Sequence, residues 1–104
     1  MRWTLRPGSA EPVTITQALG YTLPTILRFR GLRVMIYTHD HWPPHVHVIA
    51  PEAQAKIALG EARQRPHVLV NDGLTPRQLN WALTEIDRNR ELLLTRWREI
   101  YGDA

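Results

Sequence analysis

The sequence predicts an α+β domain in which an antiparallel β-sheet of four to five short strands packs on one long C-terminal α-helix. Three observations lead to this fold class. Between residues 25 and 59, apolar and polar side chains alternate in short stretches, as they do in half-buried strands. Gly31, Pro51 and Gly60 separate these stretches. From Thr75 onward, apolar residues recur at helical spacing instead.

Size and composition limit the class of protein. The chain has 104 residues, enough for one hydrophobic core, and its charged fraction of 22% is ordinary for a globular protein. No stretch approaches the roughly 18 consecutive apolar residues that a membrane-spanning helix needs. There are no cysteines, which excludes disulfides and thiolate-bound zinc. We therefore expect a cytoplasmic protein that does not enter a membrane.

The chain divides into an N-terminal extension, residues 1–23, and a single sheet-plus-helix domain, residues 24–104. In the extension, Pro7 and Pro12 interrupt the pattern, and the stretch 13–19 is too short and mixed to assign. The extension is either a β-arm, a segment that docks on a partner, or partly disordered.

Strands are expected at five places. Gly31 forms a turn between the first two, and Pro43 and Pro44 must lie outside the ladder because proline has no N–H to donate. The sequence Asn71-Asp72-Gly73 marks a turn after the last strand. The expected strands are residues 25–30, 32–38, 45–49, 53–59 and 66–70. Their helix-facing apolar side chains are Leu27, Phe29, Val34, Ile36, Val46, Val48, Ile57 and Leu59.

The helix is expected to begin after Thr75 and to end at Gly102. Thr75 is a natural N-cap, Pro76 suits the first helical position, and Gln78 completes a capping box. The apolar stripe consists of Leu79, Leu83, Ile86, Leu93, Trp97 and Ile100. The charged residues expected on its solvated face are Glu85, Asp87, Arg88, Arg90 and Glu91.

A sheet covered by one helix leaves one face open, and here that face is expected to be basic and rich in histidine. The formal net charge is +3, and residues 1–33 hold five arginines against the single acid Glu11. Arginine suits anionic partners, although a high-GC genome also enriches it without functional meaning. The side chains expected on this face are Arg28, Arg30, Arg33, Tyr37, His39, His45, His47 and Lys56.

Four histidines and one aspartate are concentrated in residues 39–47. His45 and His47 stand two apart on a strand, which separates their Cα atoms by roughly 6–7 Å and lets both imidazoles converge on one ion. We predict a divalent metal ion, such as zinc, held by His41, His45 and His47. Asp40 would supply an oxygen ligand or orient an imidazole. The alternative is a solvent-facing strand preceded by a rigid proline loop.

The same cluster also suits catalysis by acid and base. His45, His47 and Asp40 are the candidate catalytic residues, because imidazoles titrate near neutral pH. The cluster would then serve a divalent-metal hydrolase or a ribonuclease-like enzyme, with nearby cationic side chains holding a phosphate. Tyr37 and Trp42 would either stack on bases or simply pack.

The order of several motifs resembles a known family. These motifs are residues 24–28, 40–48 with Pro-Pro-His-Val-His-Val, 55–57, and 89–93 followed by Trp97. Together they resemble the small prokaryotic family named domain of unknown function 4160, over about residues 24–102. Members usually begin near Pro24, so the extension departs from the family pattern. The resemblance implies no activity, but such genes often lie beside a gene for another small domain, as toxin–antitoxin pairs do.

Two function classes follow. In the first, the protein is a subunit of a toxin–antitoxin-like two-gene module that binds a small protein encoded nearby, RNA, or a second copy of itself. The residues expected to make that contact are Arg28, Arg30, Arg33, Tyr37, Trp42 and Lys56. In the second, the histidine cluster makes the protein an enzyme. A third interpretation is that the histidine segment serves folding alone.

Overall fold

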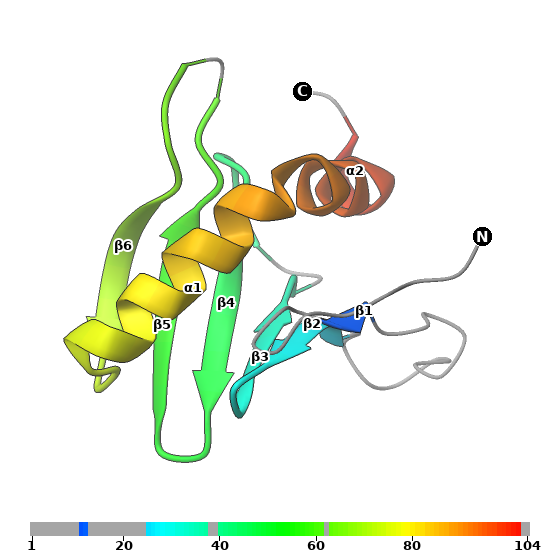
Figure 1. Ribbon diagram of the computed structural model, residues 1–104. Helices are drawn as coiled ribbons and strands as arrows, with labels where there is room; N and C mark the ends of the chain where they lie inside the picture. Colours follow the sequence, from blue (N-terminus) through cyan, green and yellow to red (C-terminus); the bar gives the residue numbers. More distant parts are fainter. Residues whose placement is uncertain (1–10, 13–24, 38–39, 62, 103–104) are drawn as a thin grey trace.

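The computed structural model describes residues 11–12, 25–37, 40–61 and 63–102. In this part of the chain, six strands form one antiparallel sheet whose spatial order follows the sequence, and two helices follow the sheet (Figure 1). The strands are β1 (Glu11–Pro12), β2 (Thr25–Phe29), β3 (Leu32–Met35), β4 (His45–Ala50), β5 (Ala53–Ala58) and β6 (His67–Asp72). The helices are α1 (Pro76–Arg88) and α2 (Arg90–Tyr101).

The α+β class and all five predicted strands are confirmed, with shifted ends. β3 stops at Met35, three residues earlier than expected, so Tyr37 lies in the loop that leads to β4. The sixth strand, β1, comes from the N-terminal extension, where Glu11 pairs with Arg28 at the edge of the sheet. Of the alternatives for the extension, a β-arm fits these two residues. The rest of the extension lies outside the described part of the chain.

The prediction of one long helix was wrong, because the helical stretch is broken at Asn89. The Asn89 side chain donates from Nδ2 to the carbonyl oxygen of Glu85, at 2.7 Å. Asparagine competes in this way for backbone groups and so weakens a helix interior. Arg90 then donates from Nε to the carbonyl of Leu59 (3.1 Å) and from a terminal nitrogen to that of Gly60 (2.7 Å). These bonds hold α2 in its new direction.

The N-terminal end of α1 is as predicted. The Thr75 side chain accepts from the backbone N–H of Gln78 (3.1 Å), and the Gln78 side chain accepts from the backbone N–H of Thr75 (2.9 Å). This reciprocal capping box satisfies two N–H groups that would otherwise lack partners within the helix.

Replacing Thr75 by alanine is expected to destabilise the protein by about 1 kcal/mol, because it removes the cap acceptor. Urea denaturation followed by circular dichroism measures the change. The matched control is Thr95→Ala on the exposed surface of α2, which should leave the free energy of unfolding within about 0.5 kcal/mol of the wild-type value. Equal losses in both variants would mean that the cap contributes nothing.

The core lies between α1 and one face of the sheet, and its composition follows the predicted pattern. All eight helix-facing apolar side chains of the strands are buried, as are Ile86, Leu93 and Trp97 of the helices. Ile100 is instead 39% exposed, because α2 no longer follows the line of α1. Among the charged side chains expected in solvent, Glu85 is buried and bonded to Arg88 at 2.9 Å.

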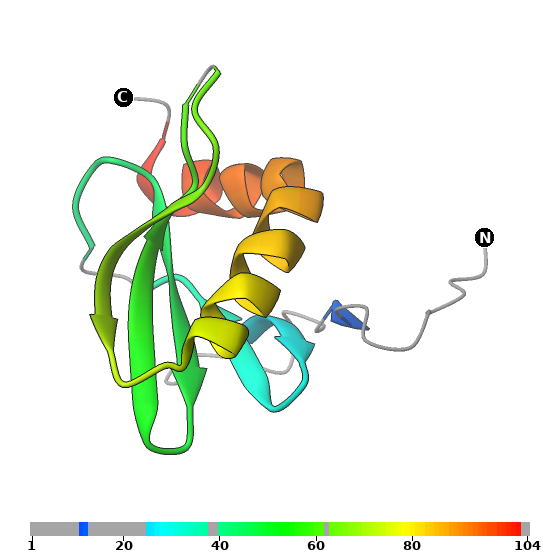
Figure 2. The same cartoon turned by 60° about the vertical axis from the view of Figure 1, so that its left-hand side comes forward.

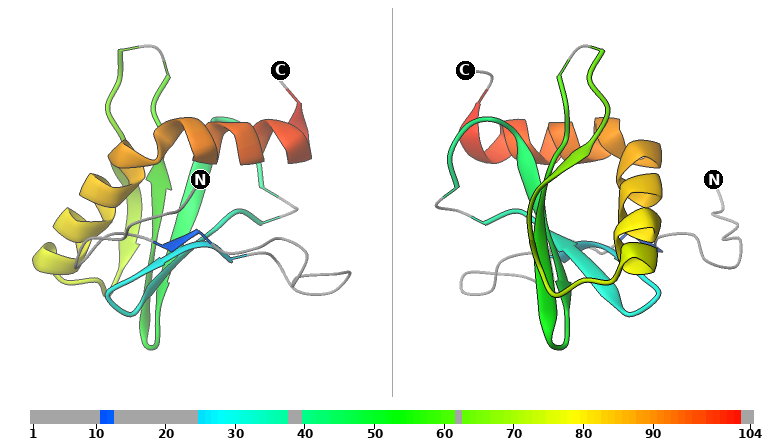
Figure 3. Two further views of the ribbon diagram at one scale, coloured as in Figure 1. Left: turned by 45° about the vertical axis from the view of Figure 1, so that its right-hand side comes forward. Right: turned by 90° about the vertical axis from the view of Figure 1, so that its left-hand side faces the viewer.

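α2 crosses the end of the sheet. Seen edge-on, α1 lies on one side of the strands and the C-terminal end of α2 reaches the other side (Figures 2 and 3). Trp97 and Tyr101 thereby approach the histidine-bearing end of β4. The sheet face that was expected to be open is therefore covered at one end. Within the described residues, no helix has the length and apolar character required to cross a bilayer.

Candidate metal centre

Three metal-ligating side chains converge where β4 begins. Asp40 comes from the loop after β3, His45 is the first residue of β4, and His47 follows two positions later on the same side of the strand. One ligand atom of each lies within 4.8 Å of the other two. Asp40 Oδ1 is 3.3 Å from His45 Nε2 and 3.1 Å from His47 Nε2.

These separations suit a metal ion. Zinc binds histidine nitrogens and carboxylate oxygens at about 2.0–2.1 Å, so two ligands of a tetrahedral ion lie about 3.3 Å apart. The two distances to Asp40 Oδ1 are close to that value. The side chains are also shielded from water, with exposed fractions of 10% for Asp40, 5% for His45 and 12% for His47. A small cation is therefore compatible with this donor set without a large rearrangement.

The hydrogen bonding of His45 determines which of its nitrogens can bind metal. Nδ1 lies 2.8 Å from the carbonyl oxygen of Pro43, which can only accept, so Nδ1 carries the proton. In the neutral ring, Nε2 then presents a lone pair. This nitrogen is buried and has no hydrogen-bond partner within the described residues. It faces a carboxylate oxygen at 3.3 Å, so either a proton on Nε2 or a metal ion between the two atoms would offset the charge of the carboxylate.

Asp40 is held in place by two tyrosines. The backbone N–H of Tyr37 donates to Asp40 Oδ2 at 3.2 Å. The hydroxyl of Tyr101 accepts from the backbone N–H of Asp40 at 2.8 Å and donates to the carbonyl oxygen of Tyr37. Burial raises the pKa of Tyr101, which keeps this hydroxyl protonated and able to donate. The last turn of α2 thus fixes the loop that carries the carboxylate.

His47 is fixed by Asp40 and Tyr37. Its Nε2 lies 3.1 Å from each oxygen of the Asp40 carboxylate, and its ring stacks on Tyr37 with the centroids 3.9 Å apart. Burial lowers the pKa of His47 below the usual histidine value, although the hydrogen bond and charge of Asp40 oppose this change. The lowered pKa favours the neutral imidazole, which is the form that binds a metal ion.

Aromatic rings close the site on the side of α2. Trp97 lies 5.2 Å from His45 and 4.3 Å from Tyr101, measured between ring centroids. The sequence predicted Trp97 as core but gave no role to Tyr101. The only signal was their spacing of four residues, which places two side chains on one face of a helix.

The structure places one of the three predicted metal ligands, His41, apart from the other two. His41 is exposed and does not belong to the cluster, which among the described residues consists of Asp40, His45 and His47. The reason is positional: β4 begins only at His45, so His41 lies in the connecting loop rather than beside the two strand histidines. Asp40, the expected oxygen ligand or orienting group, is in place. His39 lies outside the described residues.

The predicted basic face is also divided. Arg30 is in the turn after β2 with a positive φ of 48°, which takes it out of the strand alternation. Its guanidinium instead lies 4.6 Å from the ring centre of Trp81 on α1, a cation–π contact. Trp42 is in the loop before β4 and lines a cavity against α2.

The remaining basic side chains stay on the sheet. Arg28 pairs with Arg33 across β2 and β3, and Lys56 is opposite His47, beside which Tyr37 stacks. Binding of RNA or a protein partner through one continuous surface, as in a toxin–antitoxin-like module, stays a prediction. So does association with a second copy.

These features define a small α+β protein with a largely buried cluster of two histidines and one aspartate. Residues 31–98 match the family described as Domain of unknown function (DUF4160), and the chain therefore belongs to that family. The resemblance drawn from the motifs is thus confirmed. The matched segment contains all three cluster residues and lacks β1 and β2. No curated protein and no solved structure gives a significant match to the chain.

Proposed function

We propose that this protein binds one divalent metal ion, such as zinc, through Asp40, His45 and His47. The observation that carries this proposal is the Nε2 atom of His45. This nitrogen is buried, makes no hydrogen bond within the described residues and faces the Asp40 carboxylate at 3.3 Å, and its neutral form presents a lone pair. A metal ion bound by all three side chains would satisfy this nitrogen and neutralise part of the buried charge.

The number of ligands favours a catalytic role over a structural one. Structural zinc sites usually have four protein ligands, whereas catalytic sites have three and keep a position for water or substrate. Two histidines and one carboxylate leave such a position open, and the same set also suits iron(II). A bound divalent ion supplies a nucleophilic water near neutral pH. The proposed activity is therefore metal-dependent hydrolysis.

This chain's own residues have clear tasks in that activity. The carbonyl of Pro43 fixes the proton of His45 on Nδ1 and leaves Nε2 for the ion. Tyr37 and Tyr101 hold the Asp40 loop, and the stacked ring of Tyr37 restrains His47. Trp97 covers His45 and limits access of water from the side of α2.

Zinc titration of the untagged protein tests the proposal. After treatment with a chelator and its removal, we expect one equivalent of zinc to bind, and elemental analysis of protein purified without chelator to detect a near-stoichiometric metal. The control is His67→Ala, which removes an exposed histidine outside the cluster and should leave the stoichiometry and affinity unchanged. Absence of saturable zinc, iron or nickel binding to the wild-type protein would contradict the proposal.

Tyr101→Phe is expected to weaken zinc binding by roughly 10- to 100-fold, the usual effect of removing a group that positions a ligand. The substitution keeps the ring that packs against Trp97 and removes only the hydroxyl that joins Asp40 to Tyr37. Competition with a colorimetric chelator measures the affinity. If the variant binds zinc as tightly as the wild-type protein, the Asp40 loop does not depend on α2 for its position.

A further inference from the structure

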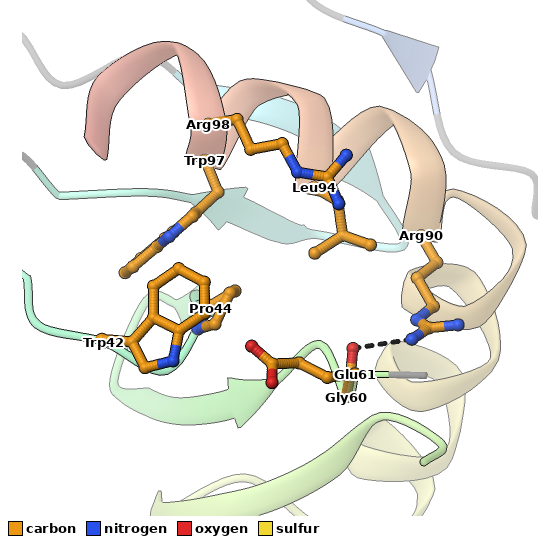
Figure 4. Close-up of a pocket in the computed structure, with 8 residues that line it drawn as sticks. All are labelled: Trp42, Pro44, Gly60, Glu61, Arg90, Leu94, Trp97 and Arg98. Atoms are coloured by element: carbon orange, nitrogen blue, oxygen red, sulfur yellow. Dashed lines mark hydrogen bonds between the residues drawn. The ribbon is translucent and has the colours of Figure 1, made fainter. Parts of the chain in front are cut away.

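A second site candidate lies where α2 faces two loops. Trp97, which also contacts His45, lines a cavity of about 340 Å³ (Figure 4). This volume is within the range of small-molecule sites, roughly 300–1,000 Å³. The loop before β4 contributes Trp42 and Pro44, and the chain after β5 contributes Gly60 and Glu61. The remaining lining residues come from α2: Arg90, Leu94, Trp97 and Arg98.

The residues of α2 that line this cavity lie on one face of the helix. Positions 90, 94, 97 and 98 recur at helical intervals, so one helix face turns towards the cavity. Arg90 ties this face to the opposite loop through its bonds to the carbonyls of Leu59 and Gly60. Leu94 and Trp97 are buried and form a firm apolar back wall. The cavity is thus preformed.

Trp42 supplies a flat aromatic surface at one end of the cavity. Its side chain is 48% exposed, and its ring meets Trp97 edge to face with the centroids 6.4 Å apart. Trp97 itself is only 1% exposed and therefore supports Trp42 from behind. An exposed indole held by a buried one is a platform on which a planar ring can stack, and nucleobases stack on such platforms regardless of sequence.

The charged side chains suit the other parts of a nucleotide. Arg98 lines the cavity on the helix side, and a guanidinium group binds phosphate oxygens well. Arg90 adds positive charge beside it, although two of its nitrogens already donate to the carbonyls of Leu59 and Gly60. Glu61 extends its carboxylate towards the end of the cavity where Trp42 lies (Figure 4). A carboxylate accepts hydrogen bonds from ribose hydroxyls or from the amino group of a base. The lining thus combines an aromatic surface, cations and one acceptor.

We propose that this cavity binds one nucleotide, either a free nucleoside monophosphate or the terminal nucleotide of an RNA chain. Inorganic phosphate would leave the Trp42 surface unused, and a purely apolar ligand would not match the charged side chains that line the cavity. A nucleic-acid duplex is much larger than a cavity of about 340 Å³. The proposal uses none of the metal ligands and does not rest on the proposed metal function.

Isothermal titration calorimetry of the full chain tests this site, with EDTA present so that no metal ion holds the phosphate. The probes are AMP, adenosine, inorganic phosphate and a short single-stranded oligoadenylate. We expect saturable binding of AMP, of the oligoadenylate or of both, with adenosine and phosphate each binding more weakly than AMP. Comparable affinity for AMP and RNA indicates a free nucleotide as the ligand, whereas much tighter RNA binding indicates an RNA end.

Two substitutions assign the binding to the cavity. Trp42→Ala should weaken binding roughly tenfold or more by removing the stacking surface, whereas Trp42→Phe should retain most of the affinity. Arg98→Gln should make AMP bind no better than adenosine. The matched control, Arg77→Gln, changes an exposed arginine at the start of α1 and should have no effect.

Three results would overturn the proposal. The first is the absence of saturable binding of both AMP and the oligoadenylate to the wild-type protein. The second is unchanged affinity in Trp42→Ala and Arg98→Gln variants that retain the wild-type circular dichroism spectrum. The third is competition by inorganic phosphate alone that is as strong as competition by AMP.

Discussion

Replacing His45 by alanine is expected to abolish stoichiometric zinc binding at micromolar protein concentrations. The substitution removes one of three ligands and leaves Asp40 and His47, which cannot hold the ion at comparable affinity. Loss of a group that merely positions a ligand costs about 10- to 100-fold, so loss of the ligand itself should exceed 100-fold. Competition titration with a colorimetric chelator measures this change.

The matched control for this prediction is His41→Ala. His41 lies close in sequence and was expected from the sequence to be a ligand, but it is exposed and outside the cluster. The His41→Ala variant should therefore bind zinc with the same affinity and stoichiometry as the wild-type protein. A second readout is the melting temperature, which excess zinc should raise in the wild type and in His41→Ala but not in His45→Ala. Equal zinc affinity in all three proteins would refute the assigned ligand set.

Trp97→Ala is expected to lower the free energy of unfolding by about 3–5 kcal/mol, the usual loss for a fully buried aromatic side chain. Trp97 is 1% exposed and touches both the core and the rings of His45 and Tyr101. Trp97→Phe should lose much less, because the indole Nε1 forms no hydrogen bond within the described residues. Urea denaturation of the metal-free proteins measures both changes.

Trp42→Ala is the control of the same residue type. Because its side chain is 48% exposed, we expect a loss well below that of Trp97→Ala, on the order of 1 kcal/mol or less. Comparing the two variants shows how much of the loss in stability is due to burial rather than to the removal of a tryptophan as such. Similar losses at positions 42 and 97 would mean that the loop before β4 contributes as much to the core as α2 does.

The sequence predicted the sheet well because its alternating pattern directly reports burial. Leu27, Val34, Val48 and Ile57 are buried as expected, since a period of two separates the faces of a strand. The helix start was equally clear, because the capping box at Thr75 depends only on neighbouring residues.

The helix break was missed because Asn89 alone does not determine it. Asn89 is tolerated within helices at modest cost, and the new direction of α2 depends on bonds from Arg90 to residues 59 and 60. Once α2 turns, Ile100 becomes exposed and Tyr101 reaches Asp40. Single-sequence periodicity contains no information about such long-range contacts.

The candidate site was predicted in part for the same reason. Spacing alone brought His45 and His47 together, because residues two apart on a strand share a face. Whether His41 and Asp40 would join them depended on the path of the loop before β4, which spacing does not determine. Arg30 left the basic face because of the positive φ at its turn, a feature that alternation does not reveal.

The position of β2 has a consequence for where this domain begins. The family match starts at residue 31, yet Ile26, Leu27 and Phe29 of β2 are buried in the core and β2 pairs with β3. A fragment cut at the family boundary would lose this wall of the core and leave β3 as a bare sheet edge, open to pairing with other chains. We therefore expect the independently folding unit to be larger than the family segment, and expression trials should retain the chain from before Thr25.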